Sequence, residues 1–253
     1  MTKAIAPALR ALLEGLIDYA GTFPPAALPC GAAASNYTTY RAGDHAWALR
    51  WLVVSAADVD RLPSEFDGSL SVLADTDCPR AAALETKRVV TAPRPVYCEV
   101  PVTALPEVKA AGCFAKVRTG GVKPDAVPSV NEVAAFIRAC ADRQLPFKAT
   151  AGLHHPVRAE HPLTYEADAP RAVMHGFLNV FLAAAFAWNG DRDIVPILAE
   201  RDPTAFRFND KAHWRDRSLE TAEVRDARTN FAHAFGSCSF EEPLRDLEAL
   251  GLL

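Results

Sequence analysis

The chain has 253 residues, of which 50% are hydrophobic and 23% are charged. This composition can bury a large apolar core and differs from that of disordered chains, so residues 1–253 are expected to form a single folded domain. The formal net charge of −4 and the lack of a long basic run argue against a nucleic-acid partner or an anionic membrane surface. The composition favours a small-molecule ligand.

The first residues and the cysteines bear on the compartment. Residues 1–16 carry charged side chains among apolar ones at helical spacing, which predicts a short helix rather than a signal peptide. The most apolar stretch, residues 174–188, is shorter than the ~20 apolar residues that a membrane-spanning helix needs. The six cysteines contain no C-x-x-C pair and are expected to be buried thiols. We therefore expect a cytoplasmic protein with no membrane partner.

Short apolar runs alternate with segments of helical pattern along the first half of the chain. Several runs have the composition of strands, and Pro24-Pro25 ends the first of them. These strand predictions cover residues 16–23, 51–56, 69–73, 88–91 and 96–100. A helix is predicted at 105–111. This alternation is typical of a parallel α/β fold.

The clearest unit runs from residue 113 to residue 150. Residues 113–118 predict a strand that ends in the loop Thr119-Gly120-Gly121. Ser129 has the position of a helix N-cap, and the apolar stripe after it predicts a helix to residue 141. Residues 145–150 predict the next strand. Together these segments form a βαβ unit.

The pattern is harder to follow after Pro156. Helices are expected at 169–188 and 219–235, with a last barrel strand at 206–208. An amphipathic helix at 241–253 is expected to cover the bottom or side of the barrel. A chain with repeated βα units and this length is typical of the (β/α)8 or TIM barrel, which has about 250 residues. The predicted fold class is therefore an α/β, TIM-like barrel that becomes irregular after residue 156.

Two lysines interrupt the strands of the βαβ unit. Side chains alternate along a strand, so Lys116 points the same way as Arg118, and Lys148 the same way as Thr150. Lysines are costly to bury against apolar helices, so both are expected to face the barrel axis at the active-site end. Neighbouring ammonium groups lower each other's pKa, and a neutral lysine can attack a carbonyl carbon. The alternative is a pair of structural lysines balanced by carboxylates such as Glu99.

The residues around the lysines resemble the core of a known family. Residues 114–120, Phe-Ala-Lys-Val-Arg-Thr-Gly, and 147–152, Phe-Lys-Ala-Thr-Ala-Gly, are similar to the two-lysine core of the deoxyribose-phosphate aldolases, which are class I barrel aldolases. The resemblance implies that Lys116, in a K-x-x-T-G context, forms a Schiff base and that Lys148 perturbs it. Residues 151–155, Ala-Gly-Leu-His-His, depart from the glycine pair and the arginine-containing continuation of that family.

Other ionisable residues lie close to this predicted site. Glu99 and Asp18 interrupt apolar strands and can balance a lysine or act as general acid and base. His154 and His155 follow the second lysine strand and can carry protons or bind an anion. For each of these residues the alternative is a structural ion pair or hydrogen bond.

A second hypothesis treats the histidines as metal ligands. His154 and His155, together with Glu99 or His175, could hold a divalent metal for isomerase or hydrolase chemistry. The sequence contains no H-x-H or H-E-x-x-H spacing to support it. The leading hypothesis therefore has no metal and no other cofactor.

Polar groups around the lysines predict an anion site. They are a guanidinium, two hydroxyls and the backbone of three glycines: Arg118, Thr119, Thr150, Gly120, Gly121 and Gly152. Such groups suit a phosphate or carboxylate, although glycine loops are also ordinary turns. Residues 236–240, Gly-Ser-Cys-Ser-Phe, lack the G-x-S-x-G pattern of a nucleophile and are expected to be a packing turn.

The leading functional hypothesis is a Schiff-base aldolase or lyase that acts on a small carbonyl compound with an anionic group. Lys116 is the expected nucleophile and Lys148 its pKa perturber, while Glu99 or a histidine carries protons. The third hypothesis is a non-catalytic barrel that binds an anionic metabolite or a partner protein. A homo-oligomer is compatible with each hypothesis.

Overall fold

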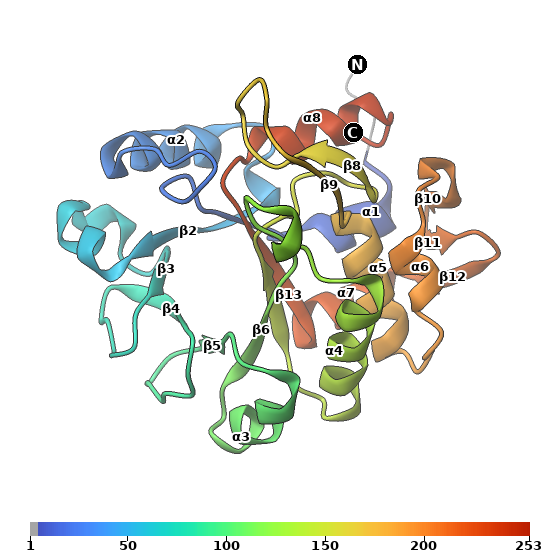
Figure 1. The fold of residues 1–253 in the computed structure, drawn as a ribbon, viewed down its shortest axis with the longest axis horizontal. Coiled ribbons are helices and arrows are strands. Elements are labelled where there is room, and N and C mark those ends of the chain that lie inside the picture. The colour runs from blue at the N-terminus through green and yellow to red at the C-terminus, as the bar shows by residue number, and fades with distance from the viewer. Residues whose placement is uncertain (1–4) are drawn as a thin grey trace.

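Eight parallel strands form a closed barrel within residues 5–253, which the computed structural model describes (Figure 1). Their order around the barrel is β1-β13-β7-β6-β5-β4-β3-β2. The strands are β1 (Ile17–Tyr19), β2 (Leu49–Ser55), β3 (Leu70–Leu73), β4 (Ala81–Thr86), β5 (Val96–Cys98), β6 (Phe114–Arg118), β7 (Phe147–Thr150) and β13 (Ala232–Ser237). The predicted α/β, TIM-like barrel is confirmed.

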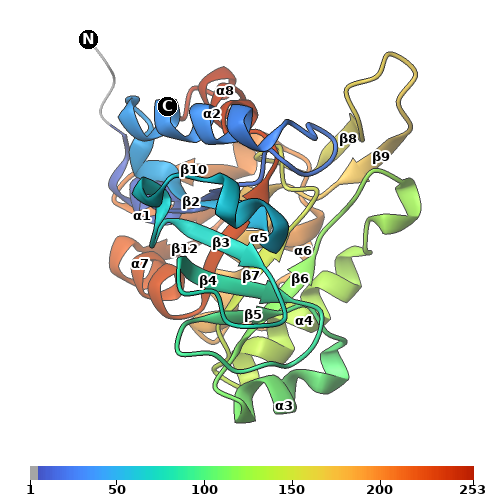
Figure 2. The ribbon, with the colours of Figure 1, turned by 90° about the vertical axis from the view of Figure 1, so that its left-hand side faces the viewer.

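Helices cover the outside of this barrel unevenly. They are α1 (Pro7–Leu13), α2 (Cys30–Ala42), α3 (Leu105–Ala110), α4 (Val130–Asp142), α5 (Phe177–Trp188), α6 (Val195–Ala199), α7 (Thr221–Asn230) and α8 (Glu241–Ala249). Between β2 and β3 the chain forms only the 3-10 turns Ala56–Arg61 and Ser64–Phe66. Figure 2 faces this side, where β3, β4 and β5 follow one another through loops. Irregularity therefore begins well before residue 156.

The βαβ unit has the predicted form. β6 and β7 are parallel neighbours, and α4 connects them. The Ser129 hydroxyl accepts a hydrogen bond from the N–H of Glu132, whose carboxylate accepts one from the N–H of Ser129. This capping box satisfies N–H groups that the first helical turn leaves free. The local sequence therefore sets the start of α4 at the predicted residue.

The strand predicted at residues 88–91 is wrong. The chain instead forms β4 between β3 and β5, and pairs with both. Its sequence, Ala-Ala-Ala-Leu-Glu-Thr, has helical propensity, but an extended conformation lets it bond to a strand on each side. This correction places Glu85 inside the barrel.

For the last third of the chain, the predicted barrel strand is wrong and the helix predicted at 219–235 is only partly confirmed. Residues 206–208 form β10 (Phe206–Phe208), which pairs antiparallel with β11 (Lys211–Trp214) outside the barrel. β12 (Arg217–Glu220) completes that small sheet. The last barrel strand is β13, which begins inside the helix predicted at 219–235 and continues beyond it, whereas α7 confirms the first part of that helix. Its sequence, Ala-His-Ala-Phe-Gly-Ser, has no β-branched residue, so its composition does not mark a strand.

Three helices differ from the predicted bounds or positions. α5 begins after a hairpin of β8 (Ala159–Pro162) and β9 (Arg171–Met174), not at residue 169. α8 lies beside the loops at the carboxyl ends of the strands rather than at the bottom or side of the barrel (Figure 1). α1 covers part of the helix predicted at 1–16, and residues 1–4 of that prediction lie outside the described residues.

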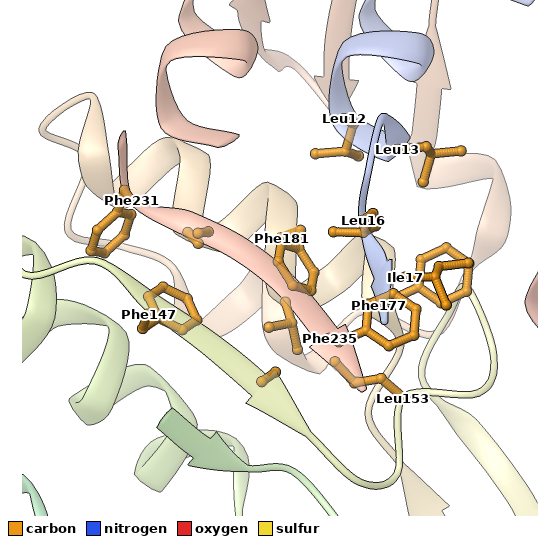
Figure 3. Close-up of a cluster of buried hydrophobic side chains, with 14 of the residues drawn as sticks. Leu12, Leu13, Leu16, Ile17, Phe147, Leu153, Phe177, Phe181, Phe231 and Phe235 are labelled. Atoms are coloured by element: carbon orange, nitrogen blue, oxygen red, sulfur yellow. The ribbon is translucent and has the colours of Figure 1, made fainter. Parts of the chain in front are cut away.

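The main apolar core lies between the barrel and its helices. Figure 3 shows aromatic side chains of β7, β13 and α5 gathered there. Phe235 stacks on Phe177 with 5.4 Å between ring centroids, and Phe147 meets Phe231 edge to face at 5.1 Å. Burying each ring stabilises the fold by roughly 1.5–3 kcal/mol. Along residues 5–253, none of the helices combines the length and apolar character required to cross a membrane.

Candidate active site

Polar side chains from several strands meet inside the barrel. Lys116 of β6 and Lys148 of β7 lie opposite each other in the parallel register, and both are buried. Asp18 comes from β1 and Glu85 from β4, while Glu99 directly follows β5. The structure therefore brings four predicted site residues together with Glu85.

Glu85 connects the two lysines. Its Oε2 atom is 3.0 Å from Nζ of Lys116, and its Oε1 atom is 2.6 Å from Nζ of Lys148. The hydroxyl of Ser71 on β3 donates a hydrogen bond to the same Oε1 atom at 2.7 Å. A carboxylate bound by two ammonium groups and a hydroxyl has enough donors to stay charged in the interior.

Each lysine has a second carboxylate partner. Nζ of Lys148 is 2.5 Å from Oδ2 of Asp18, and Nζ of Lys116 is 3.1 Å from Oε2 of Glu99. Arg118 donates a hydrogen bond from Nε to Oε1 of Glu99 at 2.9 Å. We call the following six side chains the ion network: Asp18, Glu85, Glu99, Lys116, Lys148 and Arg118. Its three negative charges balance its three positive charges.

Glu85 and Lys148 stabilise each other's charged forms. Burial alone would raise the pKa of Glu85, but the charges of Lys148 and Lys116 outweigh burial and hold this pKa well below its ordinary range. Burial would lower the pKa of Lys148, but Asp18 and Glu85 raise it. The expectation that the two lysines lower each other's pKa is therefore wrong for Lys148, because Glu85 bridges them.

A cavity of about 340 Å³ opens at the carboxyl ends of the strands. Lys116, Arg118 and Glu85 line it. Lys148 does not line it and has no exposed surface. The ion network therefore has an inner part around Lys148 and an outer part that a ligand can reach. A cavity of this volume suits a small molecule.

The predicted anion-binding groups divide into two sets. Those that line the cavity are Arg118, Thr150, Gly121 and Gly152. Thr119 and Gly120 do not line it. Thr119 has no exposed surface, and its hydroxyl donates a hydrogen bond to the carbonyl oxygen of Ala151 at 2.5 Å. This contact ties the loop after β6 to the loop after β7.

Gly120 and Gly152 let these two loops approach closely. A Cβ atom on Gly152 would lie 2.7 Å from Cα of Gly120, and the φ angle of Gly152 is +80°. We predict that Gly152→Ala lowers the free energy of unfolding, measured in urea, by roughly 1–3 kcal/mol. Gly31→Ala in α2 is the control, because a Cβ atom there meets nothing within 4 Å. Equal stability of the two variants would contradict the prediction.

His154 and His155 have different surroundings. Nδ1 of His154 is 2.8 Å from Oε2 of Glu242, and Nδ1 of His155 is 2.6 Å from Oδ2 of Asp246. His154 also lines the cavity, and its Nε2 atom is 3.9 Å from Sγ of Cys238. His155 does not line this cavity. Of the two predicted histidines, the structure therefore places only His154 in the wall of this cavity.

The ligands of the metal hypothesis do not converge. Nε2 of His175 lies 2.8 Å from the carbonyl oxygen of Pro128, and Glu99 contacts Lys116 and Arg118. Among residues 5–253, no group of three or more histidine, cysteine, aspartate or glutamate side chains is placed to hold a metal ion. The donor set that this hypothesis requires is therefore not assembled in the described part of the chain.

Sequence reasoning missed two ionisable residues of the cavity wall, Glu85 and Cys238. Glu85 belongs to a strand whose sequence favours a helix. Cys238 follows β13 in the segment interpreted as a packing turn, and it lines the cavity. The useful signal is its place at the carboxyl end of a barrel strand, where active-site residues gather. That signal becomes visible only when residues 232–237 are recognised as a strand.

Comparison with known proteins does not identify a function for this site. No protein family model matches the chain, and no curated protein or solved structure is significantly similar to it. A barrel fold by itself hosts many unrelated activities. The ion network and the cavity that it borders are therefore the features that bear on function.

Proposed function

We propose that the protein is a class I aldolase or lyase in which Lys116 forms a Schiff base with a small carbonyl compound that carries an anionic group. The observation that carries the proposal is the position of Lys116 in the cavity wall, while Lys148 is fully buried behind it. This difference agrees with the resemblance to the deoxyribose-phosphate aldolases, which implies that the earlier lysine reacts and the later one perturbs it.

The ion network suits a positively charged imine. A protonated Schiff base keeps the charge of the ammonium group that it replaces, so the contacts of Lys116 with Glu85 at 3.0 Å and Glu99 at 3.1 Å can persist. The six charges then stay balanced, and no carboxylate is left unpaired inside the barrel. Lys148 holds Glu85 from the other side at 2.6 Å.

Glu99 is the proton carrier in this proposal. Lys116 must lose a proton before it can attack a carbonyl carbon, and Glu99 is its more exposed carboxylate partner, at 18% against 2% for Glu85. The first proton moves from Nζ to Oε2 of Glu99, and the neutral amine attacks the carbonyl carbon. The carboxyl group passes this proton to the oxygen, then takes a second proton from the nitrogen and passes it to the same oxygen. Water then leaves and the protonated imine forms. Burial opposes the charges of Lys116 and Arg118, which hold the pKa of Glu99 below its ordinary value. Glu99 therefore gives the proton up readily.

Arg118 is the proposed contact for the anionic group. Its side chain is 46% exposed and lies in the cavity wall near Thr150 and the backbone of Gly121. One side of the guanidinium binds Glu99 at 2.9 Å, which fixes its orientation. A guanidinium held in this way can bind a carboxylate or phosphate through its other N–H groups.

We also propose that the protein works in the cytoplasm. All six cysteines are free thiols. Cellular reductants keep thiols reduced in the cytoplasm, whereas secreted proteins form disulfides. A free thiol in the cavity wall, such as that of Cys238, fits the reducing compartment best.

Borohydride reduction should trap the imine. The protein is incubated with small aldehydes and ketones that carry a carboxylate or phosphate and is then treated with borohydride. We expect one substituent at Lys116, located by peptide mass spectrometry, because reduction converts the imine to a stable amine. Lys116→Met should abolish the adduct. Lys109→Met is the control, because Lys109 is exposed on α3 and belongs to no part of the ion network.

Other outcomes would favour the alternatives. A compound that is turned over without any adduct at Lys116, and with full activity in Lys116→Met, would contradict Schiff-base chemistry. Binding of anionic compounds without turnover would favour the non-catalytic barrel. A stoichiometric metal ion whose removal abolishes activity would favour the metal-dependent isomerase or hydrolase.

A further inference from the structure

Cys238 lies in the wall of the same cavity, where β13 ends. It follows the last residue of β13, and 6% of its surface is exposed. Sγ of Cys238 is 3.9 Å from Nε2 of His154, whose Nδ1 atom is 2.8 Å from a carboxylate oxygen of Glu242. Thiol, imidazole and carboxylate thus follow one another in the order of a nucleophile, its base and the group that orients the base.

Separate elements of the fold hold these groups together. β7 and β13 are parallel neighbours, so the loops that carry His154 and Cys238 leave the barrel side by side. Glu242 comes from the first turn of α8. The hydroxyl of Tyr165, between β8 and β9, lies 3.6 Å from the sulfur atom. Two polar groups, from His154 and Tyr165, therefore contact the thiol, which also borders the cavity.

The charge environment of Cys238 differs from that of most other cysteines. Burial would raise the pKa of the Cys238 thiol, but its hydrogen bond with His154 and the charge of that imidazole lower it. Burial would lower the pKa of His154, but its hydrogen bonds with Cys238 and Glu242 raise it to about 9. Burial instead raises the pKa of four other thiols, those of Cys30, Cys98, Cys113 and Cys140.

We propose that Cys238 is a nucleophilic thiolate that adds to the carbonyl carbon of a small aldehyde in this cavity, with His154 as its base and Glu242 as the residue that positions His154. The thiol proton moves to Nε2 of His154. A sulfur lone pair forms the S–C bond while the π electrons of the C=O bond move to oxygen. The imidazolium then gives its proton to that oxygen, and the product is a thiohemiacetal.

An aldehyde is the class of ligand that fits the part of the cavity wall formed by Cys238 and His154. Addition to a C=O bond releases no leaving group, so one imidazole supplies all the proton transfer that the step needs. It uses no oxidant or reductant. The cavity of about 340 Å³ admits a small molecule, and the step does not involve the Lys116 amine. The inference therefore stands independently of Schiff-base formation.

Alkylation by iodoacetamide tests the inference. At pH 7, Cys238 should be modified at least about tenfold faster than Cys78, a partly exposed cysteine that serves as the internal control. His154→Gln and Glu242→Gln should each slow the alkylation of Cys238 several-fold and leave the rate at Cys78 unchanged. Propanal should protect Cys238 from alkylation in the wild-type protein and also in Lys116→Met. Circular dichroism checks that each variant is folded. If His154→Gln does not fold, the alkylation rate in Glu242→Gln tests the roles of His154 and Glu242.

Each result supports or overturns one part of the inference. A Cys238 that reacts no faster than Cys78 would overturn the thiolate. Unchanged rates at Cys238 in both folded variants would overturn the roles of His154 and Glu242. Fast alkylation without protection by propanal would overturn the aldehyde ligand. Protection in Lys116→Met without any imine in the wild-type protein would reject the proposed function while supporting this inference.

Discussion

Glu85→Gln is expected to lower the free energy of unfolding by about 3–5 kcal/mol, measured by urea titration with circular dichroism. The carboxylate of Glu85 contacts Lys148 at 2.6 Å and Lys116 at 3.0 Å, and its side chain is 2% exposed. Glutamine has nearly the same shape but carries no charge. The negative charges of Asp18 and Glu99 would then have to balance three positive charges, those of Lys116, Lys148 and Arg118. An uncompensated buried charge is among the costliest defects in a folded protein.

Two comparisons separate this effect from the loss of an ordinary ion pair. Glu160→Gln removes an exposed contact with Arg171 at 3.2 Å, which is worth about 0–1 kcal/mol. The double variant Glu85→Gln/Lys148→Met removes one charge of each sign. Its loss of unfolding free energy should therefore be smaller than the sum of the losses in the two single variants. A loss in Glu85→Gln no larger than that in Glu160→Gln would mean that water reaches the network.

The βαβ unit around the lysines could be predicted because its local signals agree with one another. Ser129 and Glu132 begin a helix with one apolar face, and apolar strands lie on both sides of it. In the barrel, Lys116 and Lys148 stand opposite each other, and Asp18 is paired with Lys148. Side chains alternate between the two faces of a strand, and this alternation depends only on the local sequence. It therefore predicts which charged residues face the barrel axis even when the other strands are unknown.

β4 and β13 could not be predicted, because their neighbours determine their conformation. Ala81–Thr86 has helical propensity, and Ala232–Ser237 has no β-branched residue. Each strand is held by a parallel partner on both sides: β4 lies between its sequence neighbours β3 and β5, whereas the partners of β13 are β1 and β7 from distant parts of the sequence. Tertiary hydrogen bonds outweigh propensities of a few tenths of a kcal/mol per residue. Glu85 and Cys238 were missed for this reason.

The partners of Cys238 illustrate the same limit. His154 precedes it by 84 positions, and only the pairing of β7 with β13 brings the two side chains together. Glu242 lies close to Cys238 in the sequence, but its partner His154 is 88 positions away. A short motif such as G-x-S-x-G encodes a nucleophile locally, whereas this arrangement depends on the order of strands around the barrel.

The stability of the protein should fall as the pH drops from 6.5 to 4.5, with His233 contributing about 2–3 kcal/mol of the loss. His233 lies near the start of β13, with Nδ1 at 2.8 Å from the hydroxyl of Tyr97. Burial and the charges of Arg50 and Arg228 together lower its pKa to about 3. Below pH 6.5 the unfolded chain therefore binds a proton that the native protein does not bind. Protonation then favours unfolding until the pH approaches the native pKa near 3.

His233→Asn isolates this contribution, because the asparagine carbonyl can still accept a hydrogen bond from Tyr97. The free energy of unfolding is measured at pH 7.5 and 4.5 for both proteins. The drop between these pH values should be about 2–3 kcal/mol larger for the wild type. At pH 7.5 the histidine is neutral in both the folded and the unfolded protein. The difference in unfolding free energy between wild type and variant at this pH therefore reports only the packing cost of the substitution. Equal drops would mean that folded His233 accepts a proton despite Arg50 and Arg228. Since His233 does not line the cavity, its acid sensitivity belongs to the barrel rather than to the candidate active site.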